Sequence, residues 1–258
     1  MSKYNNMALS ANKRLQSATG LKGGFVDGYF GNSSQEALIA SGKHIGFDWQ
    51  KLRQHFGSFN QAQVDGFNII LSAINEHGGE AMRPTYVAYI MSTIWHETAH
   101  TMQPISEIGK GRSRRYGKWF KNSKGAEYGH ANYNGTAYLK TDYPHLYYGR
   151  GYVQLTWLDN YKKLGDLLGV DLAGNPDLAM RPDISAAIMI KGMLGGLFTG
   201  LSLSRLITYG LYFEFVNARR IINSTDKDKM LAEYAVKFLD SLTLESAALI
   251  DEGTKVTC

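Results

Sequence analysis

Apolar residues recur every three or four positions along much of the chain, which is the pattern that amphipathic helices produce. The clearest example combines Val64, Phe67, Ile70, Leu71 and Ile74. Other stretches with helical spacing or nearly continuous apolar character are residues 8–18, 33–41, 84–100, 161–168, 183–200 and 230–238. The sequence therefore predicts a mainly α fold.

The stretch that Pro84 opens differs from the others because it is apolar on almost every side up to His100. A helix of that kind is buried in the protein. Its last turn nevertheless carries His96, Glu97 and His100. Burying a carboxylate is costly unless the group is paired or protonated, and a protonated carboxyl group can serve as a general acid. Glu97 is therefore a candidate proton donor, and the alternative is a helix-end glutamate that points to water.

A second carboxylate follows ten positions later, at Glu107, after the break that Pro104 introduces. Inverting glycoside hydrolases place two carboxyl groups roughly 6.5–9.5 Å apart, one as the acid and one as the base that activates a water. We expect the helix end and the short loop to place Glu97 and Glu107 across a cleft at such a separation. The alternative for Glu107 is a solvated loop residue.

Residues 147–157, YYGRGYVQLTW, combine two glycines with an alternation of apolar and polar side chains. The glycines let the backbone approach a ligand closely. The alternation predicts a short strand over residues 153–156. Its polar face, Gln154 and Thr156, could hold a sugar N-acetyl group or a water, and the alternative is an ordinary strand whose polar side chains face solvent.

This segment, followed by Asn160-Tyr161, resembles the signature of family 19 glycoside hydrolases and the related phage endolysins. Further segments resemble that family in the expected order, namely His96-Glu97-Thr98, residues 175–178 (NPDL) and residues 218–223 (ARRIIN). The likeness covers roughly residues 60–245. It implies a lysozyme-like, mainly α, two-lobed catalytic domain, an inverting mechanism, and no metal or other cofactor.

The resemblance also implies roles for individual residues. Glu97 would be the proton donor, Glu107 the general base, and Thr156 would help to hold the attacking water. The residues that would contact the sugar or line the cleft are Tyr148, Arg150, Gln154, Asn160, Arg220 and Asn223. Arg150 could serve a structural role instead. The chain departs from the family at residues 99–100 and 224–225, where glycines are common.

The first 45 residues carry a resemblance of their own. They resemble the small three-helix peptidoglycan-binding module found beside many wall hydrolases, through Leu15-Gln16, Leu21, residues 27–31 (DGYFG) and Ala37-Leu38. We therefore expect a module at residues 1–45 and a catalytic domain at residues 46–258. Asp27, Tyr29 and Phe30 would contact the wall. The alternative is a subdomain that packs on the core and binds nothing.

Other functions compete with this interpretation. Residues 96–100 also fit H-E-x-x-H, the helix of zinc metallopeptidases, in which two imidazoles on one helix face bind the metal. No downstream histidine matches the extended zinc motif. Glu127 lies far enough along the chain to be the third zinc ligand, but no motif around Glu127 supports that role. A chitinase that acts on polymers of N-acetylglucosamine and a wall-binding protein without catalysis are further alternatives.

Composition and charge narrow the choice of partner. The 258 residues carry a net charge of +5, and the densest basic segment, residues 110–124, contains no acidic residue. This segment lies in a long irregular stretch, residues 109–148, with room for a short hairpin, and it could face an anionic substrate. No dense basic stripe with interleaved aromatic residues stands out, so we expect no nucleic-acid partner. No apolar run reaches the roughly 18 residues of a membrane span.

The sequence therefore predicts an endolysin that cuts the β-1,4 bond between N-acetylmuramic acid and N-acetylglucosamine in bacterial peptidoglycan and causes host lysis. The N-terminal residues lack the apolar core of a secretory signal. We expect synthesis in the host cytoplasm without a signal peptide, and action on periplasmic or cell-wall peptidoglycan as a monomer. The resemblance implies dependence on a holin-type membrane permeabiliser. The single cysteine, Cys258, cannot form an intramolecular disulfide.

Overall fold

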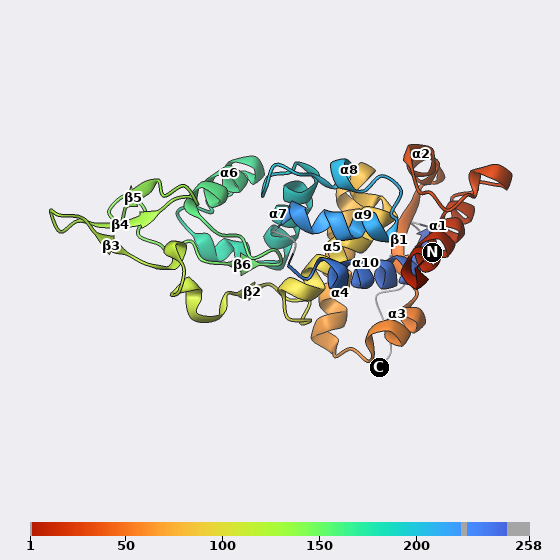
Figure 1. Cartoon of the computed structure of the whole chain (residues 1–258), viewed down its shortest axis with the longest axis horizontal. Coiled ribbons are helices and arrows are strands. Elements are labelled where there is room, and N and C mark those ends of the chain that lie inside the picture. Colours follow the sequence, from red (N-terminus) through yellow and green to blue (C-terminus); the bar gives the residue numbers. More distant parts are fainter. Residues whose placement is uncertain (1, 223–225, 247–258) are drawn as a thin grey trace. The chain divides into compact units, whose positions relative to one another are not determined.

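A computed structural model describes residues 2–222 and 226–246 of the chain. Contacts between Cα atoms divide the chain into two compact units. Unit 1 comprises residues 1–61, 70–93 and 193–258, and unit 2 comprises residues 62–69 and 94–192. Helices α4 (Gln61–His77), α5 (Pro84–Glu97) and α7 (Pro182–Leu194) contribute residues to both units (Figure 1).

Unit 1 is built almost entirely from helices. They are α1 (Lys3–Ala18), α2 (Asn32–Ser41), α3 (Trp49–Phe56), α8 (Leu203–Leu206), α9 (Tyr212–Ala218) and α10 (Asp228–Ser241), with the 3-10 helices η1 (Gly23–Phe25), η2 (Gly79–Met82) and η6 (Arg219–Ile221). Helix α10 packs against α1, α3 and α9. The Phe238 ring of α10 stacks on Phe56 of α3, with ring centroids 4.4 Å apart. Burial of such rings provides much of the free energy that holds the unit together.

The N-terminal residues share this core with the C-terminal ones. The expected boundary between residues 45 and 46 falls inside β1 (Lys43–Phe47), which pairs antiparallel with β7 (Leu242–Ser246). Residues 1–45 contain two α-helices and the 3-10 helix η1. Arg14 of α1 donates to the carbonyl oxygens of Asp240 (2.7 Å) and Leu242 (2.8 Å). Binding of a wall polymer by residues 1–45 stays a prediction.

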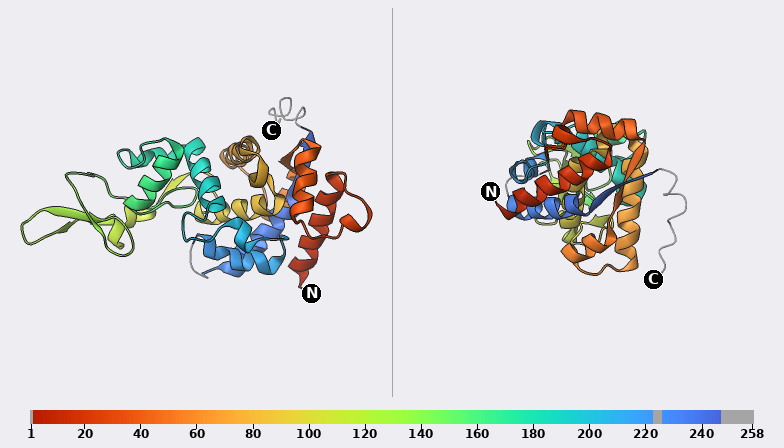
Figure 2. Two further views of the ribbon diagram at one scale, coloured as in Figure 1. Left: turned by 90° about the horizontal axis from the view of Figure 1, so that it is seen from above. Right: turned by 90° about the vertical axis from the view of Figure 1, so that its right-hand side faces the viewer.

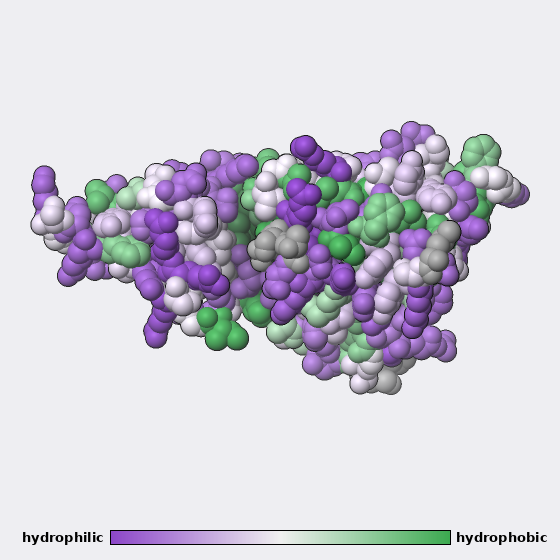
Figure 3. All heavy atoms as spheres, in the orientation of Figure 1, coloured by the Kyte–Doolittle hydropathy of each residue, from purple (hydrophilic) through white to green (hydrophobic). Residues whose placement is uncertain are grey.

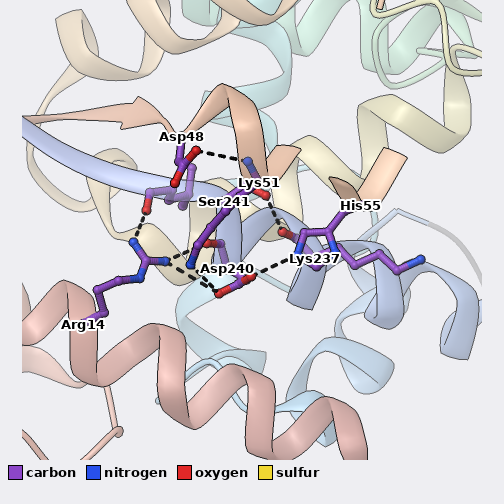
Figure 4. A network of polar contacts seen from close by, with 8 residues as sticks. Arg14, Asp48, Lys51, His55, Lys237, Asp240 and Ser241 are labelled. Atoms are coloured by element: carbon purple, nitrogen blue, oxygen red, sulfur yellow. Dashed lines mark hydrogen bonds and ion pairs between the residues drawn. The ribbon is translucent and has the colours of Figure 1, made fainter. Parts of the chain in front are cut away.

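A polar network ties three helices of unit 1 together (Figure 4). The Asp240 carboxylate accepts hydrogen bonds from His55 (2.9 Å) and Lys51 (3.2 Å) of α3, and Arg14 of α1 lies 3.9 Å away. The hydrogen bond from His55 is the largest of the effects that lower the pKa of Asp240, and Lys51 adds to it. Paired in this way, the half-buried carboxylate links α10 to α1 and α3.

Unit 2 combines helices with two small sheets. It contains α6 (Leu158–Leu168) and most of α7, with the 3-10 helices η3 (Ile108–Gly111), η4 (Arg115–Gly117) and η5 (Pro176–Met180). Strand β2 (Ile105–Ser106) pairs antiparallel with β6 (Arg150–Gly151). The second sheet contains β3 (Phe120–Lys121), β4 (Glu127–His130) and β5 (Ala137–Leu139) in that order. The stretch expected to be irregular thus holds a three-stranded sheet.

The prediction of a mainly α fold is confirmed, and most predicted helices end where the sequence indicates. Gly42 follows α2 with φ +63°, and Gly169 follows α6 with φ +67°, a conformation that glycine adopts without strain. Three predicted elements were wrong. Helix α5 ends at Glu97 instead of continuing to His100, α7 ends at Leu194 instead of continuing to residue 200, and residues 153–156 are not a strand. Arg150 and Leu155 pair through their backbones and close a tight turn over the residues between them.

The surface carries no single dominant apolar area on the face shown in Figure 3. Hydrophobic side chains appear there as small separate groups among hydrophilic ones. Within residues 2–222 and 226–246, no helix combines the length and the apolar character that crossing a membrane requires.

Candidate active site

Glu97 is the last residue of α5, and the chain turns sharply directly after it. Ala99 and His100 adopt φ values of +50° and +69°, which lie in the left-handed region that favours glycine. The buried Thr98 hydroxyl donates to the carbonyl of Ile94 (2.7 Å) and accepts from the amide of Met102 (3.2 Å). A side chain therefore fixes the turn that follows Glu97.

The segment beyond this turn lies against α4 within unit 2. The Met102 carbonyl approaches Gly66 so closely that a Cβ at that position would collide with it. Gln103 donates to the carbonyl of Ala62 (2.6 Å), and Gln63 donates to the carbonyl of His100 (2.8 Å). Gly66 is thus needed where α4 and the segment after Glu97 meet.

The geometry of His96 and His100 removes the basis of the zinc-peptidase alternative. Because α5 ends at Glu97, the two imidazoles do not share one helix face. The His100 ring stacks instead on Trp95, with centroids 4.5 Å apart, and burial lowers the pKa of His100. Trp95 in turn stacks on Phe67 of α4 at 6.2 Å. The His100 ring therefore packs on Trp95, although the residue as a whole remains exposed.

Glu107 follows β2 and is held by neighbours on both oxygens of its carboxylate. The Tyr116 hydroxyl donates to Oε1 (2.9 Å), and the Gly149 amide donates to Oε2 (3.1 Å). The Glu107 amide returns a hydrogen bond to the Gly149 carbonyl (2.8 Å). Glu107 is therefore not a solvated loop residue but an oriented carboxylate beside the segment 147–157.

Tyr116, which the sequence analysis missed, belongs to this arrangement. Burial, together with the hydrogen bond to Glu107, raises the pKa of Tyr116. The phenol is therefore protonated at neutral pH and keeps its donor. Its ring packs edge-on against Trp157, with centroids 5.1 Å apart. The only hint in the sequence is that Tyr116 is the one tyrosine of the basic segment 110–124.

Gly149 stands between Glu107 and Gln154. A Cβ at Gly149 would lie 2.8 Å from Gln154 Oε1 and 3.2 Å from Glu107 Cβ, so a larger residue would displace one of them. The Gln154 amide donates to the carbonyls of Ile105 (2.9 Å) and Gly151 (3.1 Å). The structure therefore brings Glu107, Gly149 and Gln154 together, and it commits the Gln154 amide nitrogen to the backbone.

Arg150 is buried, with 4% of its surface exposed. Its guanidinium donates to Asp177 (2.8 Å) and to the Leu146 carbonyl (3.2 Å), and it lies 3.7 Å from the centroid of the Tyr148 ring. The Tyr148 carbonyl accepts from the hydroxyl of Tyr161 (2.9 Å). These contacts favour the structural role for Arg150, which supports Tyr148 from one side of its ring.

The remaining predicted residues divide between the two units. In unit 2, Asn160 donates to the carbonyl of Thr156 (2.9 Å), and both side chains are partly exposed. In unit 1, Arg220 is exposed on η6, and its carbonyl accepts from Thr199 (2.7 Å). Asn223 lies outside the described residues.

The three residues expected to contact the wall differ in exposure. Asp27 and Tyr29 are exposed, whereas Phe30 is fully buried. Phe30 is therefore a core residue and not a contact for a polymer.

Two other features of unit 2 bear on the assignment. Glu127, the other candidate base, forms an ion pair with Lys140 (2.6 Å), and this contact lowers the pKa of Glu127. A cavity of about 660 Å³ lies beside the C-terminal end of α6, between Tyr143 and Gly174. Glu97, Glu107 and Thr156 do not line it. The cavity is therefore separate from the residues with predicted chemistry.

The amino-acid sequence of the chain matches a known protein family. The family model described as chitinase class I matches residues 60–192, just over half of the chain. Chitinase 8 of Oryza sativa subsp. japonica is 62% identical over 32 residues, which are 12% of each chain. Endochitinase 1 of Theobroma cacao is 58% identical over 40 residues, which are 15% of this chain and 12% of that protein. The chain thus matches only about an eighth of the length of these curated relatives.

Among solved structures, chitinase C from Streptomyces griseus HUT6037 aligns with a TM-score of 0.48 at 20% identity, over 74% of this chain and 76% of that one. A bacterial family 19 chitinase aligns with a TM-score of 0.47 at 22% identity, over 74% of this chain and 94% of that one.

Proposed function

This chain belongs to the chitinase class I family, glycoside hydrolase family 19, and from that premise we propose that it cuts the glycan strands of bacterial peptidoglycan. The scissile bond would be the β-1,4 linkage between N-acetylmuramic acid and N-acetylglucosamine. The reaction would proceed in one displacement by water, with inversion at the anomeric carbon.

In this mechanism Glu97 protonates the leaving oxygen while Glu107 removes a proton from a water on the opposite face of the sugar. Thr156 helps to position that water. The observation that carries the proposal is the carboxylate of Glu107, held through Oε1 by Tyr116 and through Oε2 by Gly149. Such donors set the direction of the carboxylate before substrate arrives, so the barrier includes little reorganisation. That Glu97 and Glu107 face each other over a groove stays a prediction.

The basic segment 110–124 supports peptidoglycan as the substrate. Its side chains Arg112, Arg114 and Lys118 are exposed in the same unit as Glu107. N-acetylmuramic acid carries a carboxylate on its lactyl group, or a stem peptide attached there, whereas chitin is uncharged. Positive charge beside the site attracts an anionic polymer and has no comparable effect on a neutral one.

A chitinase is the second candidate, because the names of the curated relatives favour it. The two substrates can be separated by mass spectrometry after borohydride reduction of the digest. Our proposal predicts new muramitol ends from purified sacculi, released faster than ends from chitin oligosaccharides. If the enzyme cuts chitin and releases no new sugar ends from sacculi, its substrate is chitin and not peptidoglycan.

We propose further, on the resemblance to phage endolysins, that the enzyme lyses the host at the end of infection. It would be made in the cytoplasm as a monomer and reach the wall through a holin-type permeabiliser. Expression in a host with and without such a permeabiliser tests this role. Lysis should require both proteins, and lysis by the enzyme alone would contradict the dependence.

A further inference from the structure

We propose that unit 1 contains its own binding site for a short, uncharged glycan, in a cavity that Tyr209 completes. The choice of glycan as the ligand rests on the proposed function, because a wall hydrolase meets glycan strands. The site itself rests on the geometry of unit 1 alone.

The cavity lies where the loop between α1 and α2 meets the chain before α9. Its volume is about 400 Å³, within the range of small-molecule sites. The lining side chains that the argument uses are Phe25, Asp27, Tyr29, Ser33, Thr208 and Tyr209. The loop, drawn in red, extends beyond the ends of α1 and α2 (Figure 2). Both walls of the cavity belong to unit 1.

Three aromatic side chains line the cavity and remain open to solvent. Phe25 is 70% exposed, and Tyr29 and Tyr209 are each 43% exposed. The Tyr29 and Tyr209 rings meet edge to face, with centroids 5.5 Å apart and an interplanar angle of 82°. Exposed aromatic rings in a concave site offer the flat apolar surface on which the C–H face of a sugar ring packs.

The polar lining favours an uncharged, hydroxylated ligand. Buried Gln16 donates to Asp27 Oδ1 (2.9 Å) and to Ser34 Oγ (3.0 Å), and the Tyr29 amide also donates to Asp27 Oδ1 (2.9 Å). The Asp27 carboxylate is therefore fixed in direction. No lysine or arginine lines this cavity among the residues that the structure describes. The lining therefore offers a phosphate or carboxylate ligand no cation and places the Asp27 carboxylate there instead, whereas sugar hydroxyl and amide groups can donate to Asp27 and the serines.

Tyr209 is held in place before any ligand arrives. The buried carboxylate of Glu214 accepts hydrogen bonds from the amides of Thr208 (3.1 Å), Tyr209 (3.0 Å), Gly210 (2.7 Å) and Leu211 (2.9 Å). The Tyr209 carbonyl accepts from Asn12 (2.9 Å) and from the Phe30 amide (3.2 Å). Binding then orders few groups, which favours affinity. The site also differs from one built by residues 1–45 alone, because it needs Thr208 and Tyr209.

The test counts binding events on the full chain. Glu97→Gln serves as the background, so that the probe, a tetramer of N-acetylglucosamine, is not consumed during calorimetric titration. Tyr209→Ala should lower the stoichiometry by one tetramer per chain. Tyr209→Phe keeps the ring and should leave the stoichiometry unchanged. Phe213→Ala, on exposed Phe213 of α9 outside the cavity, is the matched control and should also change nothing.

An unchanged stoichiometry in Tyr209→Ala would overturn the inference, and so would an equal loss in Phe213→Ala. In the Glu97→Gln background, Tyr209→Ala should weaken binding to sacculi about tenfold. In the enzyme with Glu97 intact, Tyr209→Ala should leave turnover of soluble oligosaccharides unchanged. The two proposals can fail separately. If the enzyme does not cut sacculi but Tyr209→Ala still binds one tetramer fewer, only the proposal of peptidoglycan as the substrate is rejected. Cut sacculi with no such loss would reject the second site alone.

Discussion

The end of α5 and the β2–β6 ribbon carry the two carboxylates proposed for catalysis, and they hold them in different ways. After Glu97 the backbone is left-handed at Ala99 and His100, where glycine would be relaxed. Around Glu107 the close contact falls on a glycine, Gly149, and hydrogen bonds orient the carboxylate. In the first region hydrogen bonds of Thr98 therefore hold a left-handed backbone turn, and in the second region hydrogen bonds hold the carboxylate itself.

The largest effect should come from the proposed acid. Glu97→Gln keeps the shape of the side chain but cannot donate the proton, so kcat should fall at least about a hundredfold. Initial rates on sacculi, with unchanged thermal unfolding, check this. Glu36→Gln, at an exposed position of α2, is the control and should retain activity. A well-folded Glu97→Gln enzyme that keeps most of its rate would remove Glu97 from the mechanism.

A loss of similar size is expected at the other carboxylate. Glu107→Gln removes the proposed base, which accepts the proton from water in our mechanism, so kcat should also fall about a hundredfold. Glu127→Gln is the matched control, because Glu127 is paired with Lys140 in the same unit. Its rate should stay within about twofold of wild type. If Glu127→Gln were the more damaged enzyme, the role of base would move to Glu127.

A smaller effect should follow from the hydrogen bond that orients Glu107. Tyr116→Phe removes the donor to Oε1 and should lower kcat about tenfold with little change in KM, because a charge-assisted bond is lost. If Tyr116 only supported the fold, Tyr116→Phe would lower kcat by the same factor with Glu107 present or replaced. Our account predicts instead that Tyr116→Phe has no further effect on kcat once Glu107→Gln is present. Additive losses in the double variant would contradict it.

The smallest effect concerns the strained turn after Glu97. Ala99→Gly should relieve the left-handed strain and raise the free energy of unfolding by about 0.5–1 kcal/mol. Ala40→Gly, on the exposed face of α2, should instead lower it by about 1 kcal/mol. Denaturant unfolding measures both. Destabilisation by Ala99→Gly as large as that by Ala40→Gly would mean that the turn is not strained.

Much of the helical framework could be predicted because its signals are local. The spacing of apolar residues predicts α4 and α10, and glycines with left-handed backbone follow the ends of α2 and α6. The pairing of β1 with β7 joins segments about 200 residues apart and has no local signal. The prediction of a strand at residues 153–156 was wrong for a different reason. Its alternation is that of a strand, but the Arg150–Leu155 backbone pair bends it into a turn.

The candidate site was predictable in part. The sequence singled out Glu97 and Glu107, and the contacts of Glu107 with Gly149 and Tyr116 appear only in the fold. Arg150 resembles a sugar-binding arginine in sequence, yet its donors go to Asp177 and to backbone carbonyls. Whether a side chain faces a ligand or its own backbone depends on distant partners, and the local pattern does not contain them.

The most direct test of the central claim is the anomeric form of the first product. Proton NMR during hydrolysis of soluble peptidoglycan strands resolves the α and β forms before they equilibrate. Displacement by a single water, with Glu97 as the acid and Glu107 as the base, predicts that the α form appears first from a β-linked strand. Initial β product, or a 1,6-anhydro end that contains no added water, would contradict the mechanism.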